Sequence, residues 1–400
     1  MTTAEPESVA VRPDFDHSTD PALIADHYAE WLRLQAECPA FKSEVFDTHD
    51  LWYVLRYDEM HEILRDPARF SSRSVDYTGE QIQRMIPIEM DPPEHGRYRQ
   101  LLTHRFSPHA VARLEPEIRR RCVELIEGVI AEGECDYTRD VAFRFPTAIF
   151  LEMMGLDVAR TDELTGHAKV ILDPSHSDED RATAAFSIVA VLMEGFAARR
   201  EEPRDDVLTE LVQATIDGQP LSDEDLLAFG FLLYLAGLDT VANVLSYSMR
   251  HLAQVPDLRH ELTAEPDRWP AAVEELLRYY TIPSVVRVVA EDTEMAGCPM
   301  KAGDRVVLPL AAADRDPRAF DRADEFDPGR VQNRHLAFGA GPHRCLGAHL
   351  ARLELRVAME EWHARIPDYS IPDGTTFVEH VGAVAGLDAL PLAWTTEETR

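Results

Sequence analysis

Residues 336–355 read Leu-Ala-Phe-Gly-Ala-Gly-Pro-His-Arg-Cys-Leu-Gly-Ala-His-Leu-Ala-Arg-Leu-Glu-Leu, and Cys345 lies at the centre of this stretch. The glycines and proline before the cysteine allow the backbone to turn tightly and to approach a flat ligand closely. The apolar residues that follow recur at helical spacing, which predicts a helix just after Cys345. Unpaired N–H groups and the positive dipole end at a helix start favour the thiolate, the form of cysteine that ligates a metal.

Taken alone, a Gly-x-Gly turn before a helix, with a cysteine that only fills space, is a common local structure. The longer pattern is more specific, and it consists of Phe338, Gly339, Gly341, His343, Cys345 and Gly347. These positions match the haem-ligand signature Phe-Gly-x-Gly-x-His-x-Cys-x-Gly, so the chain resembles the cytochrome P-450 family. The resemblance implies haem b as the cofactor, Cys345 as the ligand of its iron, and Phe338 and Gly339 beside the haem.

The resemblance covers residues 20–395 and implies a mainly α-helical fold with small β-sheets. In this fold the haem lies between a long central helix and the cysteine-ligand loop. A length of 400 residues alone favours two or three domains. We expect instead a single cytochrome P-450 domain over residues 23–400. Residues 1–22 are polar and contain prolines, which predicts a flexible N-terminal arm.

The formal net charge of −32 argues against nucleic acid and against an anionic membrane surface as partners, because both would be repelled. No run of about 18 apolar residues is present to span a bilayer. The N-terminal residues contain neither a basic nor an apolar segment of the kind found in secretory signals. We therefore expect a cytoplasmic protein, like the soluble bacterial members of the family, and a monomer.

The cysteines are odd in number and scattered, and no two of them have zinc-site or redox-motif spacing. They are Cys38, Cys122, Cys135, Cys298 and Cys345. This usage fits a reducing compartment.

The longest predicted helix begins at Ser222, a favourable N-cap followed by three acidic residues, and extends to about Gln254. Its middle is apolar on every side, which indicates burial. Gly237, Asp239 and Thr240 interrupt this apolar stretch, although glycine and aspartate are unfavourable in a buried helix. One interpretation is a glycine packing contact and a threonine hydroxyl bonded to the preceding turn. The other is a functional site.

The resemblance favours the functional interpretation, because the family places an acid and an alcohol here, across the haem from the cysteine. Asp239 and Thr240 are the expected catalytic residues. Asp239 would relay protons from solvent, and Thr240 would hydrogen-bond dioxygen at the iron.

Three further stretches provide cationic or imidazole side chains. His95 and Arg99 are four residues apart on a predicted helix that starts near Glu94, and Arg287 is the lone charge in a predicted strand, 284–289. Without the resemblance, these residues read as a solvated helix face and an edge-strand arginine. By resemblance, His95, Arg99, Arg287 and His343 bind the haem propionates, which an arginine fork suits well. Glu275 and Arg278 match the family's Glu-x-x-Arg, a structural pair.

Two loops, 71–90 and 173–180, are expected over the substrate entrance, and a hairpin within 376–392 is expected to reach the pocket. The substrate-pocket positions implied by the resemblance are Met85, Ile86, Ile88, Leu232, Leu235, Ala236, Pro283, Val286, Ala383 and Val384. They are apolar, which indicates a small hydrophobic substrate, with a terpenoid favoured. The closest resemblance is to bacterial camphor-type hydroxylases. Gln83, Arg84 and Ile88 depart from that pattern, so camphor itself is not transferred as the substrate.

The resemblance implies a monooxygenase that activates dioxygen with electrons from a [2Fe-2S] ferredoxin and a separate NAD(P)H-dependent ferredoxin reductase. The basic run Arg119–Arg121 is either a solvated helix face or a docking patch for that acidic partner. Two other functions remain open. One is a peroxygenase that uses peroxide and needs no electron donor, and the other is a non-catalytic haem-based sensor.

Overall fold

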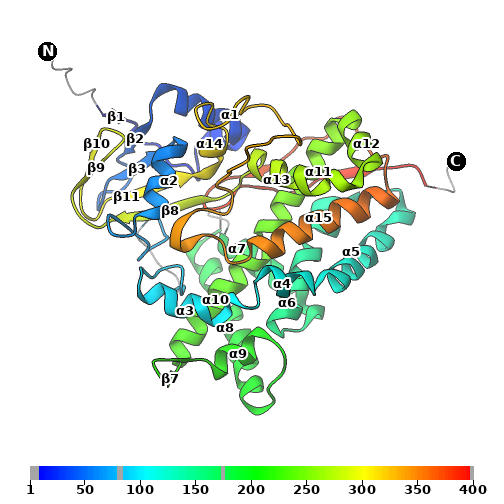
Figure 1. Ribbon diagram of the computed structural model, residues 1–400, viewed down its shortest axis with the longest axis horizontal. Helices are drawn as coiled ribbons and strands as arrows, with labels where there is room; N and C mark the ends of the chain where they lie inside the picture. Colours follow the sequence, from blue (N-terminus) through cyan, green and yellow to red (C-terminus); the bar gives the residue numbers. More distant parts are fainter. Residues whose placement is uncertain (1–8, 79–83, 173–175, 397–400) are drawn as a thin grey trace.

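The computed structural model describes residues 9–78, 84–172 and 176–396. In Figure 1 the strands gather on one side of the molecule and the helices fill the rest. The largest sheet has the order β1-β2-β3-β11-β8-β4. Its strands are β1 (Ala10–Val11), β2 (Ala40–Ser43), β3 (Leu51–Val54), β4 (Phe70–Ser71), β8 (Ser284–Val289) and β11 (Arg305–Pro309). Buried aromatic and branched residues dominate β3 and β11, which explains why the pattern of these strands was readable in the sequence.

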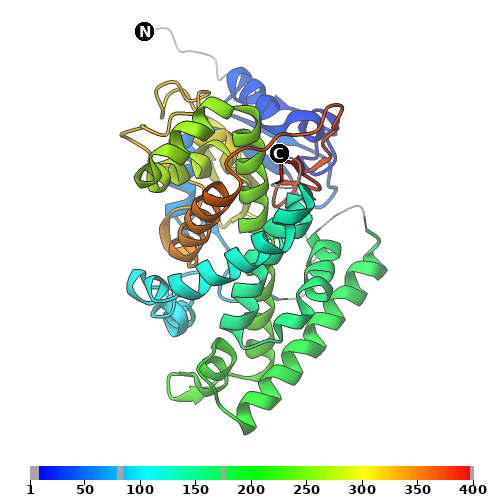
Figure 2. The same ribbon diagram turned by 90° about the vertical axis from the view of Figure 1, so that its right-hand side faces the viewer.

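Four small sheets of two strands each lie in the described residues outside this sheet. They are β5 (Glu134–Asp136) with β14 (Pro391–Ala393), β6 (Thr215–Ile216) with β7 (Gln219–Pro220), β9 (Thr293–Met295) with β10 (Cys298–Met300), and β12 (Glu379–His380) with β13 (Gly386–Leu387). The predicted hairpin near the C-terminus is therefore present as β12 and β13. In Figure 2 the C-terminal segment lies beside the N-terminal strands and helix, and β12 contacts α1.

The α-helices surround one continuous hydrophobic core. They are α1 (Pro21–Glu37), α2 (Tyr57–Arg65), α3 (Glu94–Thr103), α4 (Pro108–Ala112), α5 (Glu115–Val129), α6 (Arg144–Met154), α7 (Thr161–Leu172), α8 (Asp178–Glu201), α9 (Val207–Gln213), α10 (Asp223–Leu238), α11 (Thr240–Gln254), α12 (Pro256–Ala264), α13 (Trp269–Tyr279), α14 (Leu310–Asp314) and α15 (Ala348–Arg365). Single turns of other helix types are η1 (Ile130–Glu132), η2 (Thr138–Ala142), η3 (Val158–Arg160), η4 (Pro266–Arg268) and η5 (Gly341–His343).

The N-terminal arm predicted over residues 1–22 differs from the structure in its second half. Ala10 and Val11 pair in parallel with β2, and Phe15 is buried against aromatic rings, including that of Tyr53. Asp20 caps α1 through its side chain. Burial of Phe15 and the strand pairing hold residues 10–22 against the domain, and polar composition alone gave no sign of these contacts. Residues 1–8 lie outside the described residues.

The helix predicted from Ser222 to Gln254 is two helices in the structure. Ser222 caps α10 as expected, because its hydroxyl accepts a hydrogen bond from the Asp225 N–H. The helix is interrupted at Asp239, and α11 then extends to Gln254. The longest single helix is therefore α8, with 24 residues.

Two stretches, 178–201 and 223–254, are long and apolar enough by composition to cross a bilayer. In the second, 61% of the apolar window is buried inside the protein, as in the core helix of a globular protein. This pattern is weak evidence for a membrane span.

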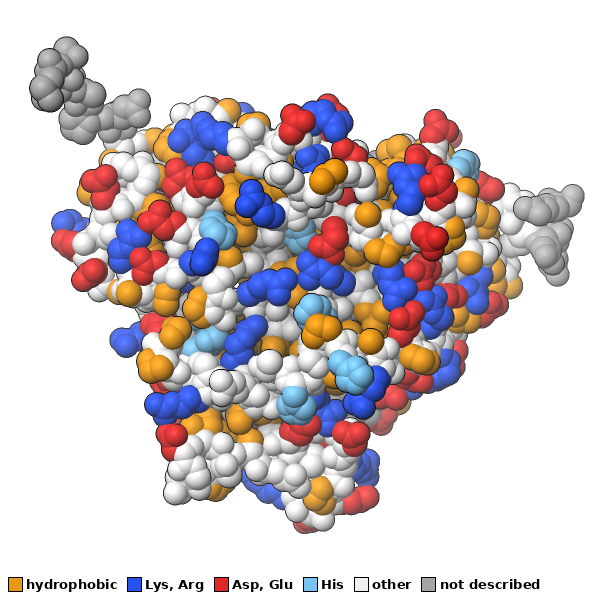
Figure 3. Space-filling model, viewed as in Figure 1, with side chains coloured by type: hydrophobic (Ala, Val, Ile, Leu, Met, Phe, Trp, Pro, Cys, Tyr) orange, Lys and Arg blue, Asp and Glu red, His pale blue; other side chains and the backbone are white. Residues whose placement is uncertain are grey.

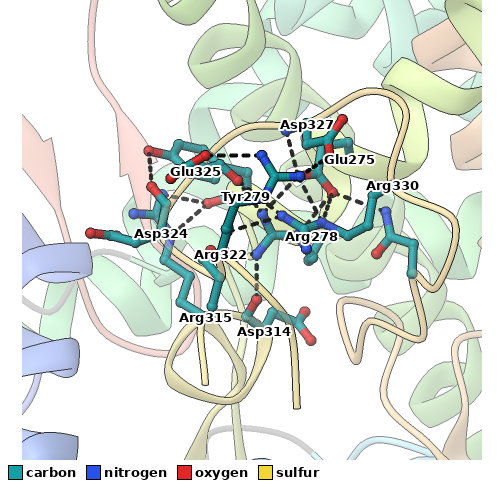
Figure 4. A network of polar contacts seen from close by, with 12 residues as sticks. Glu275, Arg278, Tyr279, Asp314, Arg315, Arg322, Asp324, Glu325, Asp327 and Arg330 are labelled. Carbon is teal, nitrogen blue, oxygen red and sulfur yellow. Dashed lines mark hydrogen bonds and ion pairs between the residues drawn. The ribbon is translucent and has the colours of Figure 1, made fainter. Parts of the chain in front are cut away.

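A buried ion pair anchors the segment that leads into the cysteine loop (Figure 4). Arg278 donates two hydrogen bonds to Glu275, with N···O distances of 2.8 and 2.7 Å, and both side chains are fully buried. Arg330 and the backbone N–H of Asp327 also donate to Glu275. Arg278 further binds the carbonyls of Asp314, Ala323 and Glu325. Because all these partners are satisfied in one geometry, the network fixes the path of residues 314–333.

Candidate functional site

The loop before Cys345 is shaped by two glycines with positive φ, Gly339 at +65° and Gly341 at +69°. A Cβ atom on Gly341 would lie 2.3 Å from the backbone oxygen of Leu64, so only glycine fits against the end of α2. The N–H of Cys345 donates to the Phe338 carbonyl over 2.8 Å. This bond closes the loop and presents the cysteine just before α15.

The environment of the Cys345 thiol combines opposing effects. Its side chain is accessible to solvent, but the surrounding protein is dense enough that burial raises the thiol pKa. The backbone N–H of Gly347 and the guanidinium groups of Arg99 and Arg344 act in the opposite direction and lower it. A coordinated metal deprotonates a thiol outright, and these positive groups then stabilise the thiolate.

Phe338 packs beside this loop as the resemblance implied for its position. The guanidinium carbon of Arg352 lies 4.5 Å from the Phe338 ring centroid, and Arg352 in turn binds Glu274. These contacts connect the start of α15 to α13.

The four predicted propionate-binding side chains come together in the structure, although they derive from three separate parts of the chain. The rings of His95 on α3 and His343 in η5 are 4.0 Å apart. Arg99 and Arg287 are close enough to lower the pKa of both histidines, and with burial they bring that of His343 to about 3. The Arg99 side chain also donates to the carbonyl of Arg344, next to the cysteine.

Arg287 is buried in the large sheet, and β8 lies between β11 and β4. The interpretation of Arg287 as an edge-strand residue facing water is therefore wrong. Burial lowers its pKa to about 10, and its guanidinium binds the Val286 carbonyl over 2.7 Å. Within the described residues it forms no ion pair with a carboxylate.

This donor set fits the carboxylates of a haem. Arg287 is a buried cation without an anionic partner among the described residues, and Nε2 of His343 is buried without a hydrogen-bond partner in that same part of the chain. Such groups are costly unless an anion or acceptor compensates them. No cluster of three or more His, Cys, Asp or Glu side chains occurs in the described residues, so Cys345 is a single protein ligand of the kind that haem iron takes.

The interruption at Asp239 opens the central helix at the predicted catalytic pair. Asp239 is 6% exposed, and burial raises the pKa of its carboxyl. The Thr240 hydroxyl donates to the carbonyl of Ala236 over 3.2 Å, and a Cβ on Gly237 would lie 2.4 Å from the Phe150 ring. Both features of the packing interpretation are thus present. The helix break and the buried acid are additional, and packing alone does not explain them.

One face of α10 is uncovered by protein, although the helix runs through the core. Leu232 and Leu235 are half-buried and Ala236 is exposed, whereas the opposite side is fully buried. Pro283 and Val384 form a bridge, and the Ser284 N–H donates to Ala383 over 2.9 Å, so these predicted pocket positions are neighbours.

The loop positions are less uniform. The Ile86 N–H donates to the carbonyl of Ala228 on α10, so this part of the loop lies against the central helix. Ile86 is fully buried and Val286 nearly so, and both belong to the hydrophobic core. Met85 and Ile88 are half-buried. Gln83 and residues 173–175 lie outside the described residues.

A cavity of about 80 Å³ adjoins the buried acid. It is lined by Phe143, Lys169, Asp239, His380, Ala383, Val384, Leu387 and Asp388. Sequence reasoning missed Lys169, His380 and Asp388. Nothing in their local pattern marks them, because three distant segments bring them together.

Comparison with known proteins identifies the family. A family model described as Cytochrome P-450 matches residues 167–362. The probable cytochrome P-450 127A1 of Sinorhizobium fredii is 40% identical over 356 residues, which is 88% of this chain and 85% of that protein. The crystal structure of CYP101J2 superposes with a TM-score of 0.86, at 30% identity, over 99% of this chain and 100% of its own. A mutant of P-450 EryK in complex with erythromycin B matches with a TM-score of 0.86, at 32% identity, over 94% and 99% of the two chains.

The fold and the cysteine loop define a haem-thiolate protein, and the relatives agree along nearly the whole chain. The chain belongs to the cytochrome P-450 family. It is an oxidoreductase and a monooxygenase, it binds haem b, and it requires an electron donor.

Proposed function

We propose that this enzyme hydroxylates a small hydrophobic substrate, with a terpenoid-like compound favoured, in the bacterial cytoplasm. The observation that best supports this proposal is the uncovered apolar face of α10, with Leu232, Leu235 and Ala236 leading to Thr240. A substrate held against that face makes apolar contacts and leaves its C–H bonds without polar competitors. Pro283, Ala383 and Val384 extend the same apolar wall.

Cys345 would hold the haem iron, and Arg99, Arg287, His343 and His95 would hold the propionates. The bound haem supplies dioxygen activation, which its thiolate ligand favours by donating electron density. Thr240 would orient dioxygen through its hydroxyl. Asp239 would deliver protons to that hydroxyl, because its raised pKa lets the carboxyl hold a proton nearer to neutral pH.

The electron donor that we propose is a [2Fe-2S] ferredoxin reduced by a separate NAD(P)H-dependent reductase. Arg65, Arg113 and Arg344 are exposed and form no ion pair with a carboxylate among the described residues. Arg65 follows Leu64 against Gly341, and Arg344 precedes the cysteine. Cationic and imidazole side chains gather across the middle of the face in Figure 3, where Figure 1 places the cysteine loop. This local excess in a chain of net charge −32 suits an acidic partner.

The run Arg119–Arg121 is a poorer docking patch. Arg119 pairs with Glu115, Glu360 and Glu361, so its charge is compensated. Arg120 and Arg121 likewise pair with glutamates on α5. The solvated-face interpretation of this run is therefore favoured.

The test is a screen for the spin-state change that a substrate causes when it displaces iron-bound water. Terpenoids, aromatic compounds, fatty acids and the macrolide erythromycin B form the panel. We expect a terpenoid to give the largest change and to be hydroxylated in the presence of NAD(P)H, ferredoxin and reductase. Product formation with peroxide alone, and none with ferredoxin, would instead identify a peroxygenase. Binding without any turnover would identify a sensor.

A further inference from the structure

The cavity beside Asp239 connects the buried acid to the C-terminal hairpin. Its volume of about 80 Å³ is enough for several waters, since one water needs roughly 10–15 Å³ of such space. Asp239 lies at its buried end, and His380 and Asp388 of the hairpin contribute polar groups to its wall. The cavity is therefore a polar passage between an acid inside the protein and groups near the surface.

His380 has two differently placed ring nitrogens. Nδ1 lies 2.9 Å from Oδ1 of Asp388, whose side chain is 52% exposed. Because an ionised carboxylate only accepts hydrogen bonds, Nδ1 carries the proton of this contact. The hairpin thus orients the ring so that Nδ1 faces the solvent side and Nε2 is left for the inner side.

Gly386 determines what Nε2 faces. This glycine pairs with His380 across the hairpin. A Cβ atom on Gly386 would lie 2.4 Å from Nε2 of His380 and 2.4 Å from Oδ1 of Asn243. The imidazole and the Asn243 amide therefore approach each other to within about 5 Å across a gap that exists only because residue 386 has no side chain.

Asn243 occupies the inner side of this gap. It is fully buried, and neither atom of its amide has a hydrogen-bond partner within the described part of the chain. Its backbone N–H donates to the Asp239 carbonyl over 3.1 Å, one helical turn away. A buried amide without partners is costly, and water in the adjoining cavity would satisfy it.

We propose that His380, oriented by Asp388, is the solvent-side proton shuttle that recharges Asp239 through the gap at Gly386. This inference rests on the proposed role of Asp239. The imidazolium releases the proton on Nε2 to cavity water hydrogen-bonded to Asn243, and this water passes a proton to the Asp239 carboxylate. The neutral imidazole then recovers one proton from bulk water at the Asp388 side. One proton enters for each proton that Asp239 gives up, and no electrons move.

The other charged groups nearby are few. Lys169 on α7 lies in the cavity wall and, like His380, lowers the pKa of Asp239. Glu379 precedes His380 in β12 but faces the other way, where it binds Tyr247 and Arg250. The titration of the passage is thus determined mainly by Asp239, His380, Asp388 and Lys169.

The first experiment measures coupling between the two titrating groups without turnover. Histidine nitrogen resonances are followed by NMR against pH in the diamagnetic ferrous carbonyl protein, and His380 is assigned by its loss in His380→Gln. Asp239→Asn removes a negative charge, so we expect it to lower the pKa of His380. An unchanged His380 titration in Asp239→Asn would overturn the proposal.

The second experiment measures proton delivery with dioxygen as the acceptor and no organic substrate. NADPH-driven oxygen uptake is recorded in water and deuterium oxide. We expect His380→Gln to slow uptake several-fold and to enlarge the solvent isotope effect. The loss is smaller than the roughly 10²-fold typical of a lost general acid, because cavity water remains. Gly386→Ala fills the gap while keeping every charge, and Asp388→Asn removes only the orienting carboxylate, so both should slow uptake in the same direction.

The matched control is His260→Gln. His260 forms an exposed pair with Asp368, over 2.7 Å, on α12 and away from the cavity, and it should leave uptake unchanged. Wild-type uptake and isotope effect in both His380→Gln and Gly386→Ala would overturn the shuttle. The carbonyl absorbance band separates this result from failure of the proposed function. If the band is intact and uptake depends on Asp239 but not on His380, only the shuttle is wrong.

Discussion

At the scale of single residues, Cys345 and Thr240 show how differently two side chains depend on context. Cys345 is placed by its own loop, because the hydrogen bond from its N–H to Phe338 and two positive-φ glycines lie within seven residues of it. Thr240 is placed by a helix break whose partners come from other segments. A test of each residue therefore examines a different level of the structure.

Cys345→Ser should abolish the absorbance band characteristic of the ferrous carbonyl complex of a thiolate-ligated haem. A serine hydroxyl does not supply the soft, electron-donating thiolate that this spectrum requires. The measurement is a carbon monoxide difference spectrum of the purified variant. Cys298→Ser, at a buried cysteine in the small β9–β10 sheet, is the control and should keep the band. A carbonyl band of normal position in Cys345→Ser would refute the ligand assignment.

Thr240→Ala should divert electrons from product to peroxide or water. The variant keeps the haem and the apolar face of α10 but lacks the hydroxyl that would orient dioxygen. The ratio of hydroxylated product to NAD(P)H consumed, with peroxide measured in parallel, should fall several-fold. Thr103→Ala removes a hydroxyl that bonds back to Arg99 in the same helical geometry, at an exposed site, and serves as the comparison. Equal coupling in Thr240→Ala and wild type would remove the case for this role.

At the scale of elements, the close approach of α2 to the cysteine loop constrains both. Gly341 meets the backbone at Leu64, whereas Gly339 has a similar positive φ but open space around its Cα. The two glycines therefore separate the cost of a left-handed backbone from the cost of a steric clash.

Gly339→Ala should cost about 1–2 kcal/mol in free energy of unfolding, the usual cost of a side chain in the left-handed region. Gly341→Ala adds a contact at 2.3 Å to a backbone oxygen that cannot rotate away, so the loop must shift. We expect Gly341→Ala to reduce haem incorporation strongly, measured as the ratio of haem to protein absorbance, and Gly339→Ala to reduce it only slightly. Similar haem content in the two variants would contradict this account of the loop.

At the scale of the whole molecule, buried neutral histidines make the stability depend on pH. His363 is 2% exposed, its Nδ1 bonds to the Met359 carbonyl and its Nε2 to the Tyr369 hydroxyl, and burial lowers its pKa to about 4. The unfolded chain binds the proton near pH 6.5 and the folded protein does not. Stability is therefore full above pH 6.5 and is lost as pH falls toward 4.

The contribution of His363 to this loss is on the order of 3 kcal/mol. His363→Gln should be less stable at neutral pH, because both hydrogen bonds are disturbed, but its stability should fall less steeply between pH 6.5 and 4. Urea unfolding midpoints across that range give the slope. His260→Gln, an exposed histidine, should keep the wild-type slope. A slope in His363→Gln equal to that of wild type would mean that this histidine does not bind a proton on unfolding.

The sequence by itself determined the cysteine loop, most helix and strand positions, and the reaction class. These features depend on local backbone chemistry, such as glycine at positive φ in the loop, the Ser222 cap on α10, and the apolar period after Cys345. The pairing of Glu275 with Arg278 was also readable, because both residues lie on one helix. The family signature added the role of the loop.

Only the tertiary structure decided the break at Asp239, the packing of residues 10–22, and the passage formed by Asn243, His380 and Gly386. The break depends on what surrounds a helix that is apolar on every side, and the passage joins residues more than 130 positions apart. Such contacts follow from burial and close approach between distant segments, and neither helical nor strand periodicity encodes them. The sequence located the haem, and the fold determined what can reach it.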